Sequence, residues 1–391
     1  MVITNKLMNT ENIYENPVSN ESEKKNISTL NKCGHYGCGW NWNCILLIFL
    51  LFGGVAVLLY FLLFLSSVQS GTSWGGANSY YVWTCSEQYQ NELFTMMRDG
   101  GFKVLRVFMI KTTDEGYPGE CGNYPDIENP VGVFQSTTID KFNRMLYLAS
   151  AYNIKIILAM HDRWSLGCWR SDAYVIKYNL PAAADPSTCN NILGSDNNPT
   201  LFYNDQLIIN DFKNRLKYML NISNPYLNNT KWGDLTNVFY SFEAQNEYLR
   251  GYVNPTNKKW ICEISKYLKT LTNIKISSGG GIECIDMLFT DSLVNCEGID
   301  MITLHDYNPK SVSKVILSYT VFHANNNGKK VILAEFGSSE LLDIKDHVDL
   351  ANSYGVPWMV WSLDKANKGL SIWNNSNIFN YLSDKCKAIN F

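Results

Sequence analysis

The sequence predicts an α/β protein in which a (β/α)8 TIM barrel is preceded by a single transmembrane helix. Two observations lead to this fold class. Past Gly71, eight short runs rich in β-branched residues alternate with helical stretches over about 320 residues, within the range of such a barrel with insertions. Before them, Ile45 to Leu65 form an uncharged apolar run of 21 residues. About 20 such residues suffice to cross a bilayer as a helix.

The expected strands are short apolar runs bounded by polar, Gly or Pro residues. They cover residues 73–81, 103–110, 154–161, 238–245, 273–280, 299–306, 330–337 and 357–363. Amphipathic stretches between them predict helices that include 87–101, 138–153, 204–221 and 257–273. A doubly wound open sheet is the alternative fold, but no Gly-rich phosphate loop follows the first strand. No repeat or linker is visible, so residues 71–391 are expected to form one domain.

The segment 44–66 is expected to be a signal anchor. Lysines precede the apolar run, whereas no Lys or Arg follows it until Arg98, so the positive-inside rule places the N-terminus in the cytosol. Residues 1–43 are polar and rich in Asn, Glu and Lys, which predicts a disordered cytosolic tail. The chain is therefore expected to be a single-pass type II membrane protein that contacts the lipid bilayer through residues 45–65.

The body after the anchor is expected to be extracellular or lumenal. The alternative is a signal peptide cleaved near Gly71, which would release a secreted body. N-x-S/T sequons at Asn221, Asn228 and Asn374 agree with either route and predict N-glycosylation.

Eight cysteines follow the apolar run, and an even number fits disulfides formed in an oxidising compartment. They are Cys85, Cys121, Cys168, Cys189, Cys262, Cys284, Cys296 and Cys386. Sequence alone leaves many pairings open. Cys168 with Cys189 and Cys284 with Cys296 are the predicted local bridges.

The chain is rich in apolar and aromatic residues and poor in charge. It is 46% hydrophobic, with 11 Trp and 23 Tyr, and only 18% of its residues are charged. The net charge is −3, and Lys and Arg occur at most in pairs. A nucleic-acid partner would require a basic surface. We therefore expect a sizeable core and no nucleic-acid partner.

Polar and aromatic side chains follow the expected strands at their carboxyl ends. They are Arg106, His161, Asn246, Glu247, His305, Tyr307, Glu335 and Trp361. Taken singly, each also has a structural explanation, such as an internal ion pair for Arg106 or a core aromatic for Trp361. In a barrel, however, the carboxyl ends of the strands hold the active site. Because so many strands end in this way, the residues are expected to converge on one site.

Two glutamates on different strands suit glycoside hydrolysis. In a retaining enzyme the carboxyl groups lie about 5–5.5 Å apart, one as proton donor and the other as a nucleophile that forms a covalent intermediate. The donor must be protonated and the nucleophile ionised. A nearby Arg106 would favour the ionised form of Glu335. The face of a Trp ring suits the apolar face of a sugar.

These residues resemble glycoside hydrolase family 5, the retaining β-glycanases of clan A, over the body from about Gly71 to the C-terminus. "FEAQNEY" resembles the family's W-E-x-x-N-E-P, which implies that Glu247 is the acid/base and follows Asn246. "ILAEFG" resembles the nucleophile strand and implies that Glu335 is the nucleophile. The two glutamates lie 88 residues apart in the family's order.

Further motifs extend the resemblance. "LRVFM" resembles the strand with the family's Arg, "LHDY" its H-x-Y after strand six, and "WMVWSL" the strand whose Trp lines the sugar-binding floor. The resemblance implies substrate-binding roles for the residues that these motifs and the third strand supply. They are Arg106, His161, Asn246, His305, Tyr307 and Trp361. The segment "NPTLFYNDQLIINDFKNRL" is most similar to the endo-β-1,4-mannanase branch.

The predicted function is therefore a retaining glycosidase that cleaves a β-linked polysaccharide and needs no cofactor or metal. A β-1,4-mannan or related β-glucan is expected, and a glycolipid head group remains an alternative substrate. Glu243 occupies the first Glu of the family motif and is interpreted as a structural carboxylate. Tyr248 and Phe242 replace the usual Pro and Trp, which leaves the substrate more open than the reaction.

Two other functions remain open at this point. "MHDR" and "LHDY" each place His-Asp at a strand end, as a metal-dependent barrel hydrolase would. A membrane-anchored sugar-binding protein that has lost catalysis would keep the same fold. The pair of glutamates favours the glycosidase over both.

Overall fold

The computed structural model describes residues 73–112, 119–183, 199–248, 258–280, 293–365, 370–374 and 376–389. All of them lie within the compact unit Val57–Phe391. The predicted tail and anchor lie outside the described residues. Within the described ranges, no helix combines the length and apolarity needed to cross a bilayer.

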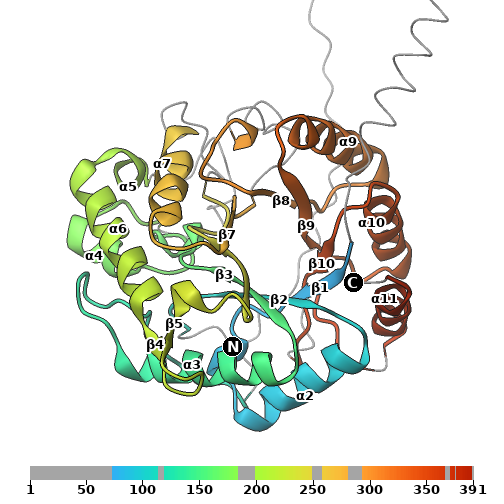
Figure 1. Ribbon diagram of the computed structural model, residues 1–391, viewed down its shortest axis with the longest axis horizontal. Helices are drawn as coiled ribbons and strands as arrows, with labels where there is room; N and C mark the ends of the chain where they lie inside the picture. Colours follow the sequence, from blue (N-terminus) through green and yellow to red (C-terminus); the bar gives the residue numbers. More distant parts are fainter. Residues whose placement is uncertain are drawn as a thin grey trace, which may run out of the picture. The chain divides into compact units, whose positions relative to one another are not determined.

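Eight parallel strands close into a barrel, which confirms the predicted fold (Figure 1). In chain order they are β1 (Gly75–Asn78), β2 (Val104–Phe108), β3 (Lys155–Ala159), β6 (Phe239–Glu243), β7 (Lys275–Ser277), β8 (Met301–His305), β9 (Lys330–Phe336) and β10 (Trp358–Val360). Each strand lies within its predicted range. Because β1 pairs with both β2 and β10, the sheet has no open edge, and the doubly wound alternative is wrong.

Helices surround the strands in Figure 1. The four predicted ones are α2 (Glu87–Asp99), α3 (Ser136–Ala151), α6 (Gln206–Asn221) and α7 (Lys258–Lys269). The others described are α4 (Ala173–Tyr178), α5 (Thr200–Asn204), α9 (Lys310–Asn326), α10 (Leu341–Ser353) and α11 (Asn377–Ala388). A short antiparallel pair, β4 (Ser223–Asn224) and β5 (Thr230–Lys231), follows α6. Side chains cap several helix starts, as Asp205 does for α6 by accepting from the backbone N–H groups of Leu207 and Ile208.

The strand period of two decides which side chains enter the barrel. On β2, Val104 belongs to the apolar cluster inside the barrel, whereas Leu105 packs in the larger core between strands and helices. The same alternation sends Arg106 and then Phe108 inward, towards the carboxyl end. The interior is therefore apolar near the amino ends of the strands and polar near their carboxyl ends. Arg106 lies in the polar part, beneath the mouth of the barrel.

The disulfides differ from the prediction. Cys262 on α7 bonds to Cys296, so the predicted Cys284–Cys296 bridge is wrong. The helix brings Cys262 to a Cα–Cα distance of 5.7 Å from Cys296 although 34 residues separate them. A second bridge joins Cys85 and Cys121.

Of the remaining described cysteines, one is disulfide-bonded and one is free. Cys168 is disulfide-bonded, but its predicted partner Cys189 lies outside the described residues. Cys386 on α11 is free and buried, so the even count does not reflect complete pairing of the body's cysteines. It packs against the backbone of β1, where a Cβ added to Gly75 would lie 2.3 Å from its Sγ.

Candidate active site

A pocket of about 260 Å³ opens at the carboxyl ends of the strands. Both glutamates of the predicted catalytic pair line it, together with aromatic and polar side chains. The lining residues are Tyr80, Phe108, Ile110, Asp162, Trp164, Trp169, Arg170, Asn246, Glu247, Tyr307, Glu335 and Trp361. Five of the predicted site residues therefore line the pocket. They are Asn246, Glu247, Tyr307, Glu335 and Trp361.

Glu247 and Glu335 approach each other at the mouth of the barrel, where β7 and β8 separate the strands β6 and β9. Glu335 lies on β9, and Glu247 follows the end of β6. Both side chains are almost fully buried, and a carboxylate oxygen of each lies within 4.8 Å of the other and of a ring nitrogen of His305. Glu247 has a φ of +48°, a conformation that is costly for a residue with a side chain. The fold thus holds Glu247 in a strained conformation that directs it into the pocket.

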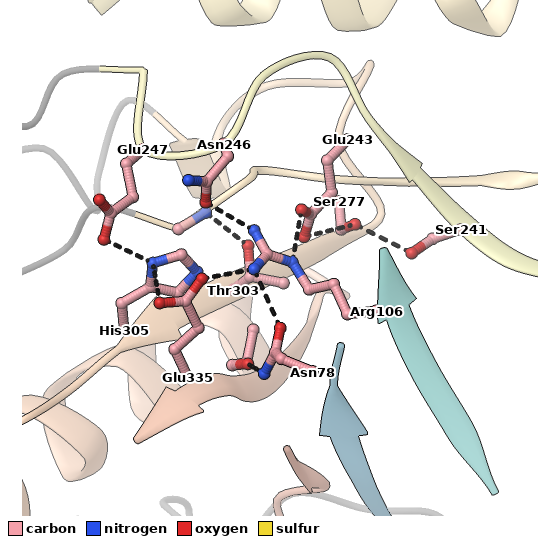
Figure 2. Close-up of polar contacts among 12 residues, drawn as sticks. Asn78, Arg106, Ser241, Glu243, Asn246, Glu247, Ser277, Thr303, His305 and Glu335 are labelled. Atoms are coloured by element: carbon pink, nitrogen blue, oxygen red, sulfur yellow. Dashed lines mark hydrogen bonds and ion pairs between the residues drawn. The ribbon is translucent and has the colours of Figure 1, made fainter. Parts of the chain in front are cut away.

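Arg106 lies at the centre of the polar cluster and donates to four side chains (Figure 2). Its Nε donates to Glu243 at 2.8 Å, and its Nη2 donates to Asn246 at 2.7 Å. Its Nη1 donates to Glu335 at 2.5 Å and to Asn78 at 3.2 Å. Arg106 is fully buried. A buried guanidinium needs such partners to offset its desolvation.

Glu335 is almost fully buried and lies against three polar side chains. Besides Arg106, the hydroxyl of Tyr307 donates to its Oε2 at 3.0 Å, and Nδ1 of His305 lies 3.5 Å from the same oxygen. Burial raises the pKa of Glu335 above its ordinary value, and the neighbouring Glu247 adds to this rise. His305 and Arg106 oppose it. Arg106 therefore acts in the predicted direction, but burial outweighs it.

Two side chains hold the carboxylate of Glu247. The indole Nε1 of Trp164 donates to Oε2 at 2.6 Å, and Nδ1 of His305 lies 2.8 Å from Oε1. His305 ends β8 and is fully buried, so it reaches both glutamates from behind the pocket surface.

The loop after β3 is joined to the end of β6. Asp162 and Asn246 form an isolated parallel β-bridge, and the amide Nδ2 of Asn246 donates to Asp162 at 3.0 Å. Arg170 pairs with the other oxygen of Asp162 at 3.4 Å. Asn246 therefore has its oxygen on Arg106 and its nitrogen on Asp162, which fixes the orientation of its amide.

Aromatic rings form two walls of the pocket. Trp361 stacks on Tyr80 with ring centroids 5.4 Å apart and an interplanar angle of 6°. Trp164 and Trp169 stack at 4.7 Å and 16°. Such faces suit the C–H-rich faces of sugar rings.

Two of the polar residues lie away from the pocket surface. His161 is fully buried, with Nε2 at 2.7 Å from Asp172 and Nδ1 at 2.9 Å from the amide of Gln245. Glu243 is also fully buried, and its two oxygens accept from Arg106 and from Ser277. Neither lines the pocket. This placement agrees with a structural role for Glu243, and it sets His161 apart from the residues near the two glutamates.

The positions of the side chains show whether the site could bind a metal ion. Glu247, His305 and Glu335 offer three ligand atoms within 4.8 Å of one another, the one such group found among the described residues. The guanidinium of Arg106, however, already donates to Glu335 at 2.5 Å and supplies the positive charge there. The two His-Asp motifs do not converge, because His161 is bound to Asp172. The arrangement therefore fits poorly with a metal-dependent hydrolase.

Several residues of the pocket and of the cluster beneath it are not among the predicted site residues. They are Asn78, Tyr80, Asp162, Trp164, Trp169 and Arg170. Asn78 lies inside the first predicted strand, 73–81, and ends the observed strand β1. Tyr80 lies within the predicted range 73–81, and Asp162 belongs to the "MHDR" motif, but neither was given a role in sugar binding. Trp164, Trp169 and Arg170 lie beyond the end of the third predicted strand, where the alternating pattern no longer marks them.

Comparison with solved structures finds similar folds in enzymes named as mannanases and as an endo-glycoceramidase. The endo-1,4-beta-D-mannanase of Thermotoga petrophila RKU-1 shares 18% identity at a TM-score of 0.62, covering 81% of this chain and 99% of that one. The endo-1,4-beta-mannanase of Rhizomucor miehei shares 17% identity at a TM-score of 0.63, covering 82% and 98%. Endo-glycoceramidase II of Rhodococcus sp. shares 11% at a TM-score of 0.54, covering 81% and 78%. At these identities the likeness shows the fold.

The family follows from the sequence itself. No curated protein matches this chain. The family model described as Cellulase (glycosyl hydrolase family 5) matches residues 65–367, a span that holds the barrel strands and both pocket glutamates. The chain therefore belongs to glycosyl hydrolase family 5 and is a glycosidase.

Proposed function

We propose that this chain is a retaining glycosidase that cleaves a β-linked polysaccharide, with Glu335 as nucleophile and Glu247 as acid/base. The observation that carries the proposal is the separation of the two carboxylates, whose oxygens approach within 4.8 Å. Retaining enzymes hold their carboxyl groups about 5–5.5 Å apart, whereas inverting enzymes need about 6.5–9.5 Å to admit a water molecule.

In the first step, an oxygen of Glu335 attacks the anomeric carbon and forms a glycosyl ester. The bond to the leaving-group oxygen breaks at the same time, and Glu247 gives that oxygen its proton. Arg106 and Tyr307 donate to Glu335 and hold its attacking oxygens in place. Positioning of this kind lowers the entropic part of the barrier.

In the second step, Glu247 is ionised and takes a proton from water, whose oxygen attacks the same carbon and displaces Glu335. Two inversions give overall retention of the β configuration. Asn246, fixed by Arg106 and Asp162, is placed to hydrogen-bond a sugar hydroxyl, and Trp361 to carry the sugar ring.

A β-1,4-mannan or a related β-glucan is the proposed substrate. The two aromatic walls suit sugar rings, and two of the similar structures are named as mannanases. A glycolipid head group is a second candidate. It is favoured by the apolar run 45–65, a proposed membrane anchor, and by the likeness to an endo-glycoceramidase.

The test is sugar release by residues 71–391 on β-1,4-mannan, β-glucans, xylan and glycosylceramide. We expect release from one of these, first as the β anomer by NMR, and a loss of at least about 10³-fold in Glu335→Gln. Thermal unfolding of the variant at the wild-type temperature is the control for folding. Wild-type turnover by Glu335→Gln, or an initial α product, would refute the mechanism. A folded protein that is inactive on every substrate would favour the sugar-binding alternative.

A further inference from the structure

Trp164 lies in the loop after β3, in a short 3-10 helix spanning Arg163–Ser165. Its side chain is buried, yet it lines the pocket. Nothing in the family motifs quoted above assigns it a role. Its indole N–H donates to Oε2 of Glu247 at 2.6 Å, a short bond of the strength expected when the acceptor is charged.

Three features hold the indole in that position. The ring of Trp164 stacks on Trp169, and the guanidinium of Arg163 lies 5.6 Å from it. The loop itself is joined to the segment after β6 that carries Glu247, because the backbone N–H of Arg163 donates to the carbonyl of Asn246 at 3.0 Å. This backbone contact joins the segment that carries the donor to the segment that carries the acceptor.

The two oxygens of Glu247 meet different partners. An indole nitrogen donates and never accepts, so Oε2 faces a permanent donor. Oε1 faces Nδ1 of His305 at 2.8 Å, and an imidazole can either donate or accept. The proton that Glu247 gives and recovers can therefore reside on Oε1, whereas Oε2 stays an acceptor.

We propose that Trp164 is a positioning residue of the reaction: its indole N–H fixes Oε2 of Glu247 and favours the ionised carboxylate. The inference rests on the proposed acid/base role of Glu247. A hydrogen bond to the charged form favours that form. Trp164 thereby sets the pH above which Glu247 has lost the proton that it must give to the leaving group.

The experiment compares pH profiles of kcat/KM for wild type and Trp164→Phe, which keeps an aromatic ring against Trp169 but removes the donor. The basic limb should move to higher pH by about one unit, because the carboxylate has lost one hydrogen bond. At the optimum, kcat/KM should fall about tenfold. A basic limb that stays at its wild-type position would overturn the proposal.

The matched control is Trp260→Phe. Trp260 is also buried, but its indole nitrogen has no hydrogen-bond partner among the described residues, and it does not line the pocket. This change removes the same atoms from the core, so a general effect of packing would appear in both variants. We expect the basic limb of Trp260→Phe to coincide with that of the wild type, and a shift equal to that of Trp164→Phe would overturn the proposal.

A second measurement needs neither activity nor a folded Trp164 variant. In wild-type protein labelled with 15N-tryptophan, the indole N–H resonance of Trp164 should move as Glu247 titrates and stay fixed in Glu247→Gln. A resonance that is static in the wild type would overturn the positioning role. Because this titration reports the contact directly, it separates a failure of this inference from a failure of the proposed glycosidase mechanism.

Discussion

Arg106 interacts with several of the polar side chains at the site. It orients Asn246, donates to Glu335 and neutralises Glu243, all without exposure to water. A lysine offers one compact charge and cannot donate in a planar fork, so it could not serve these acceptors together. The alternation of side chains along β2 explains why Arg106 was predictable. This alternation turns Arg106 into the barrel, where a cation is stable only if it is paired.

Tyr307 gives a local test of the charge on Glu335. Burial raises the pKa of Glu335, so activity that requires its ionised form is lost as the pH falls through a value above that of an ordinary glutamate. The hydroxyl of Tyr307 donates to Oε2 at 3.0 Å and favours the ionised form. Tyr307→Phe should therefore move the acidic limb of kcat/KM upward by about half a pH unit or more.

The measurement is kcat/KM against pH on the substrate identified above. Tyr307 is 39% exposed, so its loss should leave the unfolding temperature nearly unchanged. An acidic limb that moves to lower pH would contradict this reading of Glu335.

At the scale of elements, the junctions after the strands decide where the functional groups point. All eight strands were predictable because a parallel barrel strand is a short apolar run with punctuation at both ends. The polar residues at the strand ends followed from the same pattern. Trp164 and Trp169 did not, because their loop takes its path from the bridge between Asp162 and Asn246, a contact between distant parts of the chain. The Cys262–Cys296 bridge was missed for the same reason, since packing of α7 creates it.

Gly279, just after β7, makes one of these junctions possible. It has a φ of +89°, and a Cβ there would lie 2.0 Å from the carbonyl oxygen of Gln245. Its own carbonyl accepts from the backbone N–H of Glu247 at 2.9 Å. Gly279→Ala should therefore displace the end of β6, with a loss of about 2–4 kcal/mol in the free energy of unfolding and a large fall in kcat.

Gly132→Ala is the control for the backbone conformation alone. Gly132 has a φ of +88°, but an added Cβ would meet nothing within 4 Å. We expect a loss of only about 1 kcal/mol, measured by urea unfolding, and unchanged kcat. Equal effects of the two substitutions would show that the contact with Gln245 is unimportant.

At the scale of the whole molecule, we propose a tethered enzyme whose body lies outside the cytosol. The two described disulfides and the bonded Cys168 suit an oxidising compartment. The sequon residues Asn221, Asn228 and Asn374 are exposed, as glycan attachment requires. The apolar run itself lies outside the described residues, so the sequence remains the basis for the anchor.

Expression of the full chain in a secretory cell tests this topology. We expect the protein to stay in the membrane after carbonate extraction and to gain mobility on gels when N-glycans are removed enzymatically. Substitution of all three asparagines by Gln should abolish that gain, and sealed microsomes should protect the body from protease. A body that carries no glycan and is digested in sealed microsomes would place it in the cytosol.

The contact between Trp164 and Glu247 has a consequence for how such barrels diversify. Loops on a rigid barrel are usually regarded as exchangeable parts that alter substrate choice and leave the chemistry alone. Here one loop supplies both a wall of the pocket and a donor to Glu247, the proposed acid/base. If Trp164 acts as proposed, grafting a different loop after β3 should change the preferred glycan and the pH dependence together.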